Sequence, residues 1–255
     1  MLRGFLLDLD GTVYDGGKPI PGAPEAIARL RQMGYALRFV TNTTSRDRAA
    51  LVEKLQGMGV AATVNDIFAP PYAAACYLRE QQASAMLLLT ESAQREFAGV
   101  ATDVTRPDYV VVGDMGELWT FAHLNQAFRA LMAGAGLIAL GLSRYWRTAD
   151  GNLSLDAGPF VAALQFASGV EPVVLGKPAR LFFQMAWQDV GLEPGQLAMV
   201  GDDIDGDAEG AQRAGLRGIL VRTGKFREED LRGGVRPDAV LESLADLPDA
   251  VGRVA

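Results

Sequence analysis

The stretch FLLDLDGTVYDGG, residues 5–17, leads from three apolar residues directly into Asp8, Leu9 and Asp10, and then into a Gly-Thr pair. A short apolar run that ends in polar residues predicts a buried β-strand that stops near Asp8. The period of two along a strand would place Asp8 and Asp10 on the same side, and Gly11 would let the backbone turn tightly after them. Both carboxylates could then face one reacting centre.

Similar apolar runs recur along the chain and alternate with helix-like stretches. The runs cover residues 35–42, 84–90, 108–114, 136–141, 172–177, 197–203 and 218–225. The stretches with helical character include 23–33, 46–58, 117–132 and 178–190. Strands that alternate with helices are typical of parallel β-α units. We therefore predict an α/β fold with a Rossmann-like parallel sheet core and helices on both faces.

Four of the predicted strands end in residues that can carry chemistry. These residues are Asp8 and Asp10, Thr41 and Asn42, Lys177, and Asp202 and Asp203. Ligands of open parallel sheets bind in the crevice beyond the carboxyl ends of the strands. We therefore expect these four strand ends to contribute to one crevice.

The middle of the chain has apolar runs of its own and a probable turn sequence at Asp150 and Gly151, which predicts a β-hairpin within residues 144–158. An inserted domain would explain this, because an insertion leaves both flanking segments able to complete one sheet. We predict a discontinuous core of residues 1–80 and 176–255, and an inserted α/β domain of residues 81–175.

The composition excludes several classes of protein. A net charge of −7 over 255 residues argues against a general nucleic-acid binder, which needs clustered Lys and Arg. No apolar run approaches the roughly 18 residues of a membrane span, and Asp8 comes too early for a signal peptide, so we expect a cytoplasmic protein. The single cysteine, Cys76, excludes an intrachain disulfide, and the single histidine, His123, excludes sites with several His ligands.

The motifs at these strand ends resemble those of one family. The stretch DLDGTVYDGG resembles the first motif of the haloacid dehalogenase (HAD) superfamily of aspartyl-phosphate phosphohydrolases, and VTNTTS (40–45), LGKP (175–178) and VGDDIDGD (200–207) resemble its second, third and fourth. The wide gap between the second and third motifs resembles class IIA, in which a large α/β cap is inserted there. The stretches at 107–115, 143–164 and 221–227 are most similar to the phospholysine phosphohistidine inorganic pyrophosphate phosphatase branch.

The resemblance implies a phosphatase mechanism with defined roles. Asp8 would be the nucleophile that forms an aspartyl-phosphate, and Asp10 would be the general acid and then the general base. Lys177 would neutralise the nucleophile and the transferring phosphoryl group. Thr41, with the side chain of Asn42 or the backbone N–H groups of Asn42 and Thr43, would donate hydrogen bonds to phosphoryl oxygens.

Two acids that face a phosphate dianion repel it, so this site would require a cation. Oxygen ligands favour Mg²⁺, which Asp8, the backbone carbonyl of Asp10 and Asp202 would hold. Asp203 and Asp207 would orient these ligands or hold Lys177. The resemblance also implies a small phosphorylated substrate, with pyrophosphate or phosphoramidate (P–N) compounds as candidates, and a homodimer formed through the cap.

Other functions remain open at this point. The alternative functions are a noncatalytic small-ligand-binding module with the same fold, and a sugar-phosphate or nucleotide phosphatase of the same class. Asp10 argues against the dehalogenase branch, in which attack occurs at carbon and a second acid is not needed. A phosphomutase normally has its cap between the first and second motifs, where this chain has no room.

Overall fold

The computed structural model describes residues 1–148 and 150–254, which form two compact units. The first unit contains residues 1–41, 49–68 and those from Lys177 onward, and the second contains residues 42–48 and 69–176. The sequence-based division at residues 80 and 175 differs at the first junction, because α3 (Pro70–Gln81) belongs to the second unit. There, Arg79 donates hydrogen bonds to the carbonyls of Glu96 and Ala98. As a division into functional domains, the predicted boundaries stay a prediction.

The first unit is built on a six-stranded sheet in the order β14-β13-β12-β1-β4-β5, in which every pairing is parallel. The strands are β1 (Gly4–Leu7), β4 (Ala36–Val40), β5 (Ile67–Phe68), β12 (Leu197–Gly201), β13 (Arg217–Val221) and β14 (Ala239–Leu241). All four residues of β1 are buried, and Leu7 lies opposite Val200 and Phe39. The strand that precedes Asp8 is therefore an interior strand of the sheet.

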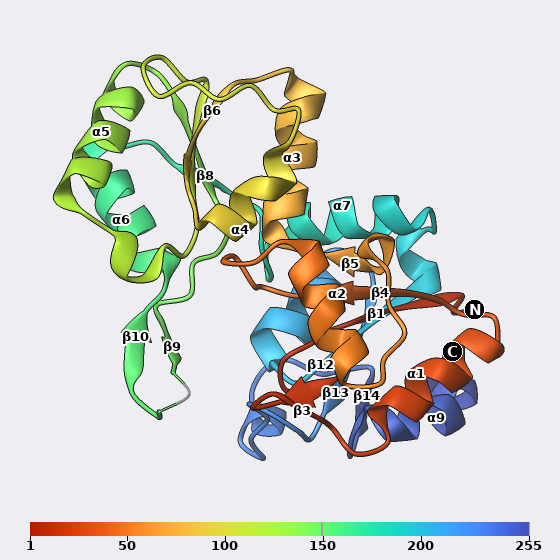
Figure 1. The fold of residues 1–255 in the computed structure, drawn as a ribbon. Coiled ribbons are helices and arrows are strands. Elements are labelled where there is room, and N and C mark those ends of the chain that lie inside the picture. Colours follow the sequence, from red (N-terminus) through yellow and green to blue (C-terminus); the bar gives the residue numbers. More distant parts are fainter. Residues whose placement is uncertain (149, 255) are drawn as a thin grey trace. The chain divides into compact units, whose positions relative to one another are not determined.

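Helices cover both faces of this sheet. They are α1 (Ala23–Gln32), α2 (Arg48–Gly57), α7 (Arg180–Val190), α8 (Gly210–Arg213) and α9 (Leu247–Val254). Helix α1 contacts α9, and α7 contacts α8; Figure 1 shows α7 on the opposite side of β1 and β4 from α1 and α9. The apolar face of α1 buries Ala23, Ala26, Ile27 and Leu30, which recur at helical spacing. The prediction of a Rossmann-like core is confirmed.

The second unit has its own parallel sheet in the order β11-β8-β7-β6. Its strands are β6 (Ala85–Leu88), β7 (Tyr109–Val112), β8 (Gly136–Ala139) and β11 (Pro172–Val174), and its other helices are α4 (Glu91–Gln94), α5 (Phe121–Met132) and α6 (Ala157–Ser168). Helices α5 and α6 contact each other, and their buried Leu131 and Val161 pack with Val110 and Leu137 of the sheet. The predicted inserted α/β structure is confirmed.

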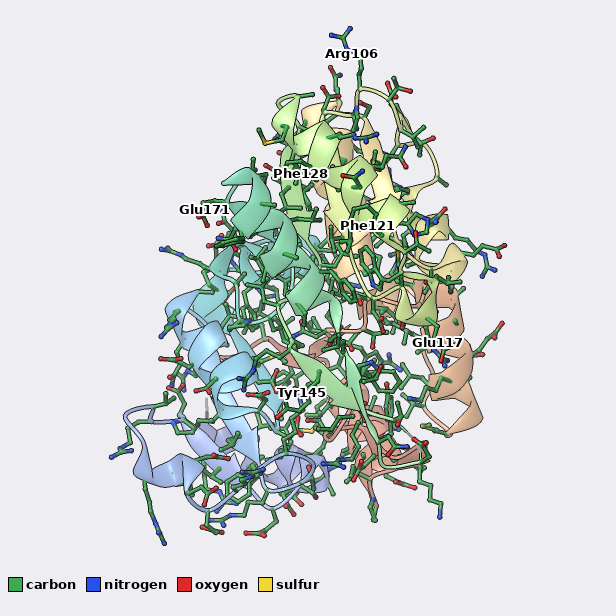
Figure 2. All side chains as sticks on the ribbon, turned by 90° about the vertical axis from the view of Figure 1, so that its left-hand side faces the viewer. Arg106, Glu117, Phe121, Phe128, Tyr145 and Glu171 are labelled. Carbon is green, nitrogen blue, oxygen red and sulfur yellow. The ribbon has the colours of Figure 1, made fainter. Side chains whose placement is uncertain are left out.

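The predicted hairpin is present in the second unit. Strands β9 (Tyr145–Arg147) and β10 (Leu153–Leu155) pair antiparallel, with Trp146 opposite Ser154. Between the two strands, Ala149 lies outside the described residues. Figure 2 labels Tyr145 on this hairpin, where the side chain is exposed to solvent. No helix in the described residues is long and apolar enough to cross a membrane.

The strand before Lys177 belongs to the second unit and lies within the predicted inserted segment of residues 81–175. Strand β11 pairs in parallel with β8 of the second sheet, Pro172 opposite Leu137, so one of the four strand ends expected at the crevice comes from the other sheet. An apolar run carries no information about its pairing partner, so either sheet could have taken this strand. Lys177 is instead the residue at which the chain enters the first unit.

Candidate active site

Asp8 lies at the carboxyl end of β1 and forms a buried ion pair with Lys177. Its backbone N–H continues the β1–β12 pairing by donating to the carbonyl of Val200 at 2.9 Å. The Lys177 ammonium donates to Oδ1 of Asp8 at 2.5 Å and to Oδ1 of Asp207 at 2.6 Å. All three residues are buried. Lys177 thus reaches Asp8 although its strand belongs to the other sheet.

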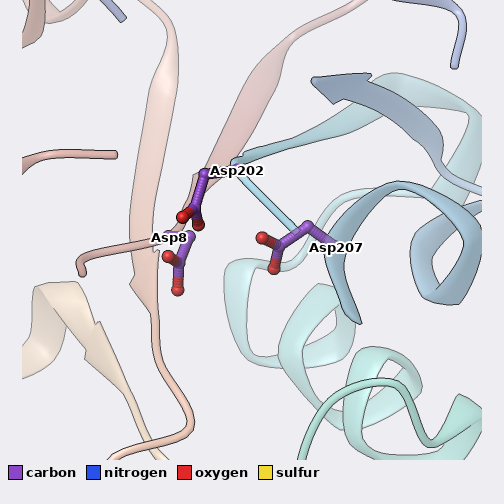
Figure 3. A group of neighbouring side chains, drawn as sticks. All are labelled: Asp8, Asp202 and Asp207. Atoms are coloured by element: carbon purple, nitrogen blue, oxygen red, sulfur yellow. The ribbon is translucent and has the colours of Figure 1, made fainter. Parts of the chain in front are cut away.

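A third carboxylate, that of Asp202, completes a buried cluster with Asp8 and Asp207. One carboxylate oxygen from each residue lies within 4.8 Å of the others. Figure 3 shows the three side chains facing one another at the end of the strands. Asp202 directly follows β12, and Asp207 lies on the π-helical turn η5 (Ile204–Glu209).

Glycine makes this close approach possible. A Cβ on Gly201 would overlap the carboxylate of Asp207, and a Cβ on Gly11 would overlap that of Asp202. Gly11 also has a φ of +88°, in the left-handed region that other residues adopt at a cost. Gly11 and Gly201 therefore leave the space that the carboxylates of Asp202 and Asp207 occupy.

Asp203 organises the turn that carries Asp207. The Asp203 carboxylate accepts hydrogen bonds from the backbone N–H groups of Asp205 at 3.2 Å and Gly206 at 2.9 Å, in the manner of a helix N-cap. The Asp203 N–H donates to the second oxygen of Asp207 at 3.1 Å. Both oxygens of Asp207 are thus hydrogen-bonded, one by Lys177 and one by this turn.

The charges of the cluster are not balanced. Burial, together with the charge of Asp8, raises the pKa of Asp202 to about 7, against the lowering effect of the hydrogen bond from the Lys225 N–H. Burial likewise raises the pKa of Asp207 to about 6, although Lys177 opposes this. Burial would lower the pKa of Lys177, but the charges of Asp207 and Asp8 outweigh it and raise that pKa, so Lys177 remains an ammonium. Within the buried cluster the Lys177 ammonium therefore faces three carboxylates, and the charge of Lys225 acts on Asp202 as well.

This imbalance and the donor atoms fit a divalent cation. Carboxylate oxygens are the hard ligands that Mg²⁺ and Ca²⁺ prefer. An unpaired buried charge is costly, so a cation beside Asp8 and Asp202 would relieve the repulsion between them. The arrangement could therefore hold a metal ion next to the Asp8 carboxylate.

Asp10 stands apart from this cluster, in the turn after β1. The turn is closed by N–H groups of Val13 and Tyr14, which donate to the carbonyl of Leu9 at 2.9 and 3.0 Å. Asp10 is exposed, yet partial burial of its carboxyl group raises its pKa, against the lowering effects of Lys54 and Lys225. The Lys54 ammonium lies 3.6 Å from the ring centroid of Tyr14. The sequence gives no signal for Lys54, because a helical pattern does not show that a Lys of α2 lies near the turn after β1.

The predicted phosphate-binding residues lie where the chain passes from the first unit into the second, between Thr41 and Asn42. Thr41 is buried and follows β4, and its N–H donates to the carbonyl of Phe68 at 3.3 Å. Asn42 and Thr43 open the segment 42–48, which belongs to the second unit. Their role in phosphate binding stays a prediction.

The segment 42–48 is held by the region around α4. The hydroxyl of Thr90 donates to the carbonyl of Ser45 at 2.6 Å. The Asp47 carboxylate, which is buried, pairs with Arg95 at 3.0 Å. Further along, the Arg48 guanidinium pairs with Glu96, also at 3.0 Å. Two ion pairs and a hydrogen bond thus fix the loop that follows Thr41.

The turn of residues 223–226 is a further element of the site that the sequence pattern did not indicate. The Lys225 N–H donates to Oδ2 of Asp202 at 2.6 Å, and the Lys225 ammonium lies 3.4 Å from the Asp203 carboxylate. The available signal is only that polar residues follow the apolar run of β13, just as Asp202 follows that of β12.

Comparison with known proteins identifies relatives along the whole chain. Residues 5–102 match the family described as haloacid dehalogenase-like hydrolase, and residues 174–247 match one described as HAD-hydrolase-like. The chain is 41% identical to the phospholysine phosphohistidine inorganic pyrophosphate phosphatase of Homo sapiens over 97% of its own length and 93% of the relative's. It is 42% identical to the haloacid dehalogenase-like hydrolase domain-containing protein 2 of Bos taurus over 90% of its length and 87% of the relative's.

A solved structure with a similar fold is the p-nitrophenyl phosphatase from Archaeoglobus fulgidus. It superimposes with a TM-score of 0.91 at 32% sequence identity and covers 98% of this chain and 99% of its own. The 4-nitrophenylphosphatase from Thermotoga maritima gives a TM-score of 0.89 at 30% identity, with coverages of 98% and 97%. The likeness therefore extends over both units.

The raised pKa of Asp202 predicts a pH-dependent stability in protein stripped of divalent cations. Because the folded state binds a proton on Asp202 more tightly than the unfolded state, stability is gained as pH falls through about 7 and is lost as pH rises. Between pH 8 and pH 6, this one group should add about 1 kcal/mol to the free energy of unfolding. Urea denaturation in EDTA at both pH values measures it.

Asp202→Asn should lose this part of the pH dependence, since the variant has no carboxyl group to titrate there. Asp205→Asn is the matched control, because Asp205 lies in the same acidic segment but is exposed. Equal pH dependence in wild type and Asp202→Asn would contradict the assignment.

Proposed function

Because the chain belongs to the haloacid dehalogenase-like hydrolases, we propose that it works through an aspartyl-phosphate formed on Asp8. It is a phosphatase that acts on small phosphorylated compounds. The observation that carries the proposal is the Asp8 carboxylate at the end of a buried interior strand, paired with the Lys177 ammonium at 2.5 Å. A nucleophile for phosphorus needs to be fixed in place and charge-compensated, and this arrangement supports both needs.

In the first step, an oxygen of Asp8 attacks phosphorus, and the bond from phosphorus to the leaving group breaks. Lys177 holds Oδ1 of Asp8, so Oδ2 is the oxygen that remains to attack. Asp10 donates its proton to the leaving group, which departs neutralised. The raised pKa of Asp10 favours the protonated form that this step requires.

In the second step, water attacks the phosphorus of the aspartyl-phosphate, and the bond between phosphorus and Asp8 breaks. Asp10, now a carboxylate, takes the proton from the attacking water, which restores its starting state. Inorganic phosphate leaves, and Asp8 is again a carboxylate paired with Lys177. The exposure of Asp10 supports this role, because a group that serves both leaving group and water has to reach solvent.

We further propose that Asp8, the backbone carbonyl of Asp10 and Asp202 hold Mg²⁺. The ion, when bound, supplies positive charge between the carboxylates and the phosphoryl group. Asp207 lies in the same cluster, but both of its oxygens are hydrogen-bonded, so we assign it to positioning Lys177. Asp203 orients the turn that carries Asp207.

The remaining assignments concern the phosphoryl oxygens and the substrate. We propose that Thr41, Asn42, Thr43 and Lys177 donate hydrogen bonds to the phosphoryl group, and that residues 81–175 form a cap that selects the leaving group. The name of the relative from Homo sapiens points to pyrophosphate and P–N compounds as substrates. Sugar phosphates or nucleotides are the alternative. A cytoplasmic location and a homodimer through the cap complete the proposal.

Asp8→Asn should abolish phosphate release. The amide keeps the shape of the side chain but is a far weaker nucleophile, so the rate should fall at least about a thousandfold. Phosphate release from p-nitrophenyl phosphate and from pyrophosphate measures it. Asp205→Asn should retain wild-type activity. Substantial turnover by Asp8→Asn would remove Asp8 as the nucleophile, and an inactive wild type would favour the noncatalytic alternative.

Chelation should stop the reaction, and Mg²⁺ should restore it. Without the ion, Asp8 and Asp202 repel the phosphate dianion that has to approach them. The measurement is phosphate release in EDTA, followed by titration with MgCl₂ in excess. Activity that survives EDTA would rule out the metal assignment.

A substrate panel should show which leaving groups the enzyme accepts. If the likeness to the pyrophosphate phosphatase branch extends to specificity, pyrophosphate and phospholysine should give kcat/KM values at least equal to those of sugar phosphates and nucleotides. The panel is read as phosphate release at a fixed Mg²⁺ concentration. Hydrolysis of sugar phosphates or nucleotides alone would transfer the proposal to the alternative substrate class.

A further inference from the structure

We propose that the turn of residues 223–226 is a positioning element for Asp202, which sets the affinity of the site for its divalent cation. This inference rests on the proposed function, in which Asp202 is a ligand of that cation. The turn follows β13, the neighbour of the strand that ends at Asp202. Neither Thr223 nor Gly224 has a part in the reaction steps described above.

The turn contacts Asp202 through its backbone. Phe226 N–H donates to the carbonyl of Thr223 at 3.2 Å and closes the turn, which directs the Lys225 N–H at Oδ2 of Asp202 at 2.6 Å. In the described part of the chain, Oδ1 of Asp202 accepts no hydrogen bond. The turn therefore fixes one oxygen of Asp202 and leaves the other for a ligand.

The same turn is joined to the loop that carries Asp8 and Asp10. The Thr223 hydroxyl donates to the carbonyl of Gly11 at 2.5 Å. A backbone carbonyl left without a hydrogen bond away from water costs free energy. The Thr223 hydroxyl satisfies the carbonyl of Gly11 and so holds the loop directly after Asp10 in place. Two ligand-bearing loops, after β1 and after β12, are thus connected to one turn.

Gly224 shows how closely the turn approaches. A Cβ at this position would overlap Oδ2 of Asp202 and lie 2.5 Å from Cα of Gly11. Gly224 also has a φ of +59°, which favours glycine. Any side chain here would have to displace Asp202, Gly11 or the turn itself.

The turn is anchored at its base, so it does not depend on Asp202 for its own position. Arg222 N–H donates to the carbonyl of Leu241 on β14 at 2.9 Å. The Arg222 guanidinium forms ion pairs with Glu228 and Glu242 and lies 5.1 Å from the ring centroid of Phe226. A turn held from the sheet side can impose an orientation on the carboxylate that it contacts.

Gly224→Ala tests the proposal directly. Titration calorimetry of MgCl₂ into the protein, without substrate, should show the Kd for Mg²⁺ raised roughly 10- to 100-fold, the usual effect of disturbing a group that orients a metal ligand. The Mg²⁺ concentration for half-maximal phosphate release should rise in parallel. The KM for substrate at saturating Mg²⁺ should stay near the wild-type value, since the turn contacts a cation ligand.

Gly34→Ala is the matched control. Gly34 also has a positive φ, +86°, but a Cβ there would meet no atom within 4 Å, so the variant reproduces the backbone strain without the contact. It should bind Mg²⁺ with wild-type affinity. Circular dichroism and a melting curve show whether each variant is folded.

Thr223→Val and Thr223→Ser provide a second test if Gly224→Ala does not fold. The valine removes the hydroxyl that donates to Gly11 and should weaken Mg²⁺ binding, whereas the serine keeps the hydroxyl and should restore it. Folded Gly224→Ala with the wild-type Kd, or Thr223→Val and Thr223→Ser with equal affinities, would overturn the inference. A wild type that binds no Mg²⁺ and releases no phosphate would instead overturn the proposed function.

Discussion

The site depends on one constraint, the burial of the Lys177 ammonium between Asp8 and Asp207 at 2.5 and 2.6 Å. A buried charge without a partner is very costly, so none of the three residues can be buried without the others. Asp202 adds a third carboxylate to this cluster, and burial together with the charge of Asp8 raises its pKa to about 7. The cost of removing these charges from water offsets most of their attraction, so the ion pair adds little to the free energy of unfolding. Its main effect is to fix the charges that a ligand of this site would meet.

This constraint joins segments that lie far apart in the sequence. Asp8 and Lys177 are separated by 169 positions, and both segments of the second unit lie between them in the sequence. Strand β1 from the first segment of the first unit and β12 from its last segment are neighbours in the sheet, so sheet formation brings Asp8 beside Gly201 and Asp202. The second unit can therefore vary as an insertion, provided that the chain returns at Lys177.

The sequence predicted much of the fold, because interior strands and exposed helices have distinct hydrophobic periods. It missed β5 and β14, which have two and three residues and are too short to show a period. It treated the end of β11 together with three strand ends of the first sheet, because an apolar run does not encode its pairing partner. The Asp8–Lys177 contact was anticipated through the resemblance to known motifs. The turn of residues 223–226 acts through a backbone N–H and a glycine, which no side-chain pattern reveals.

The four acids near β1 and β12 differ mainly in what holds them. Asp8 is bound by Lys177, Asp202 by the Lys225 N–H, and Asp207 by Lys177 and the Asp203 N–H. Among the described residues, none donates a hydrogen bond to the Asp10 carboxylate. An acid that has to give up a proton and then recover one is hindered by fixed donors, which stabilise its ionised form. The environment of each carboxylate, rather than its residue type, therefore separates the fixed acids from the one suited to move a proton.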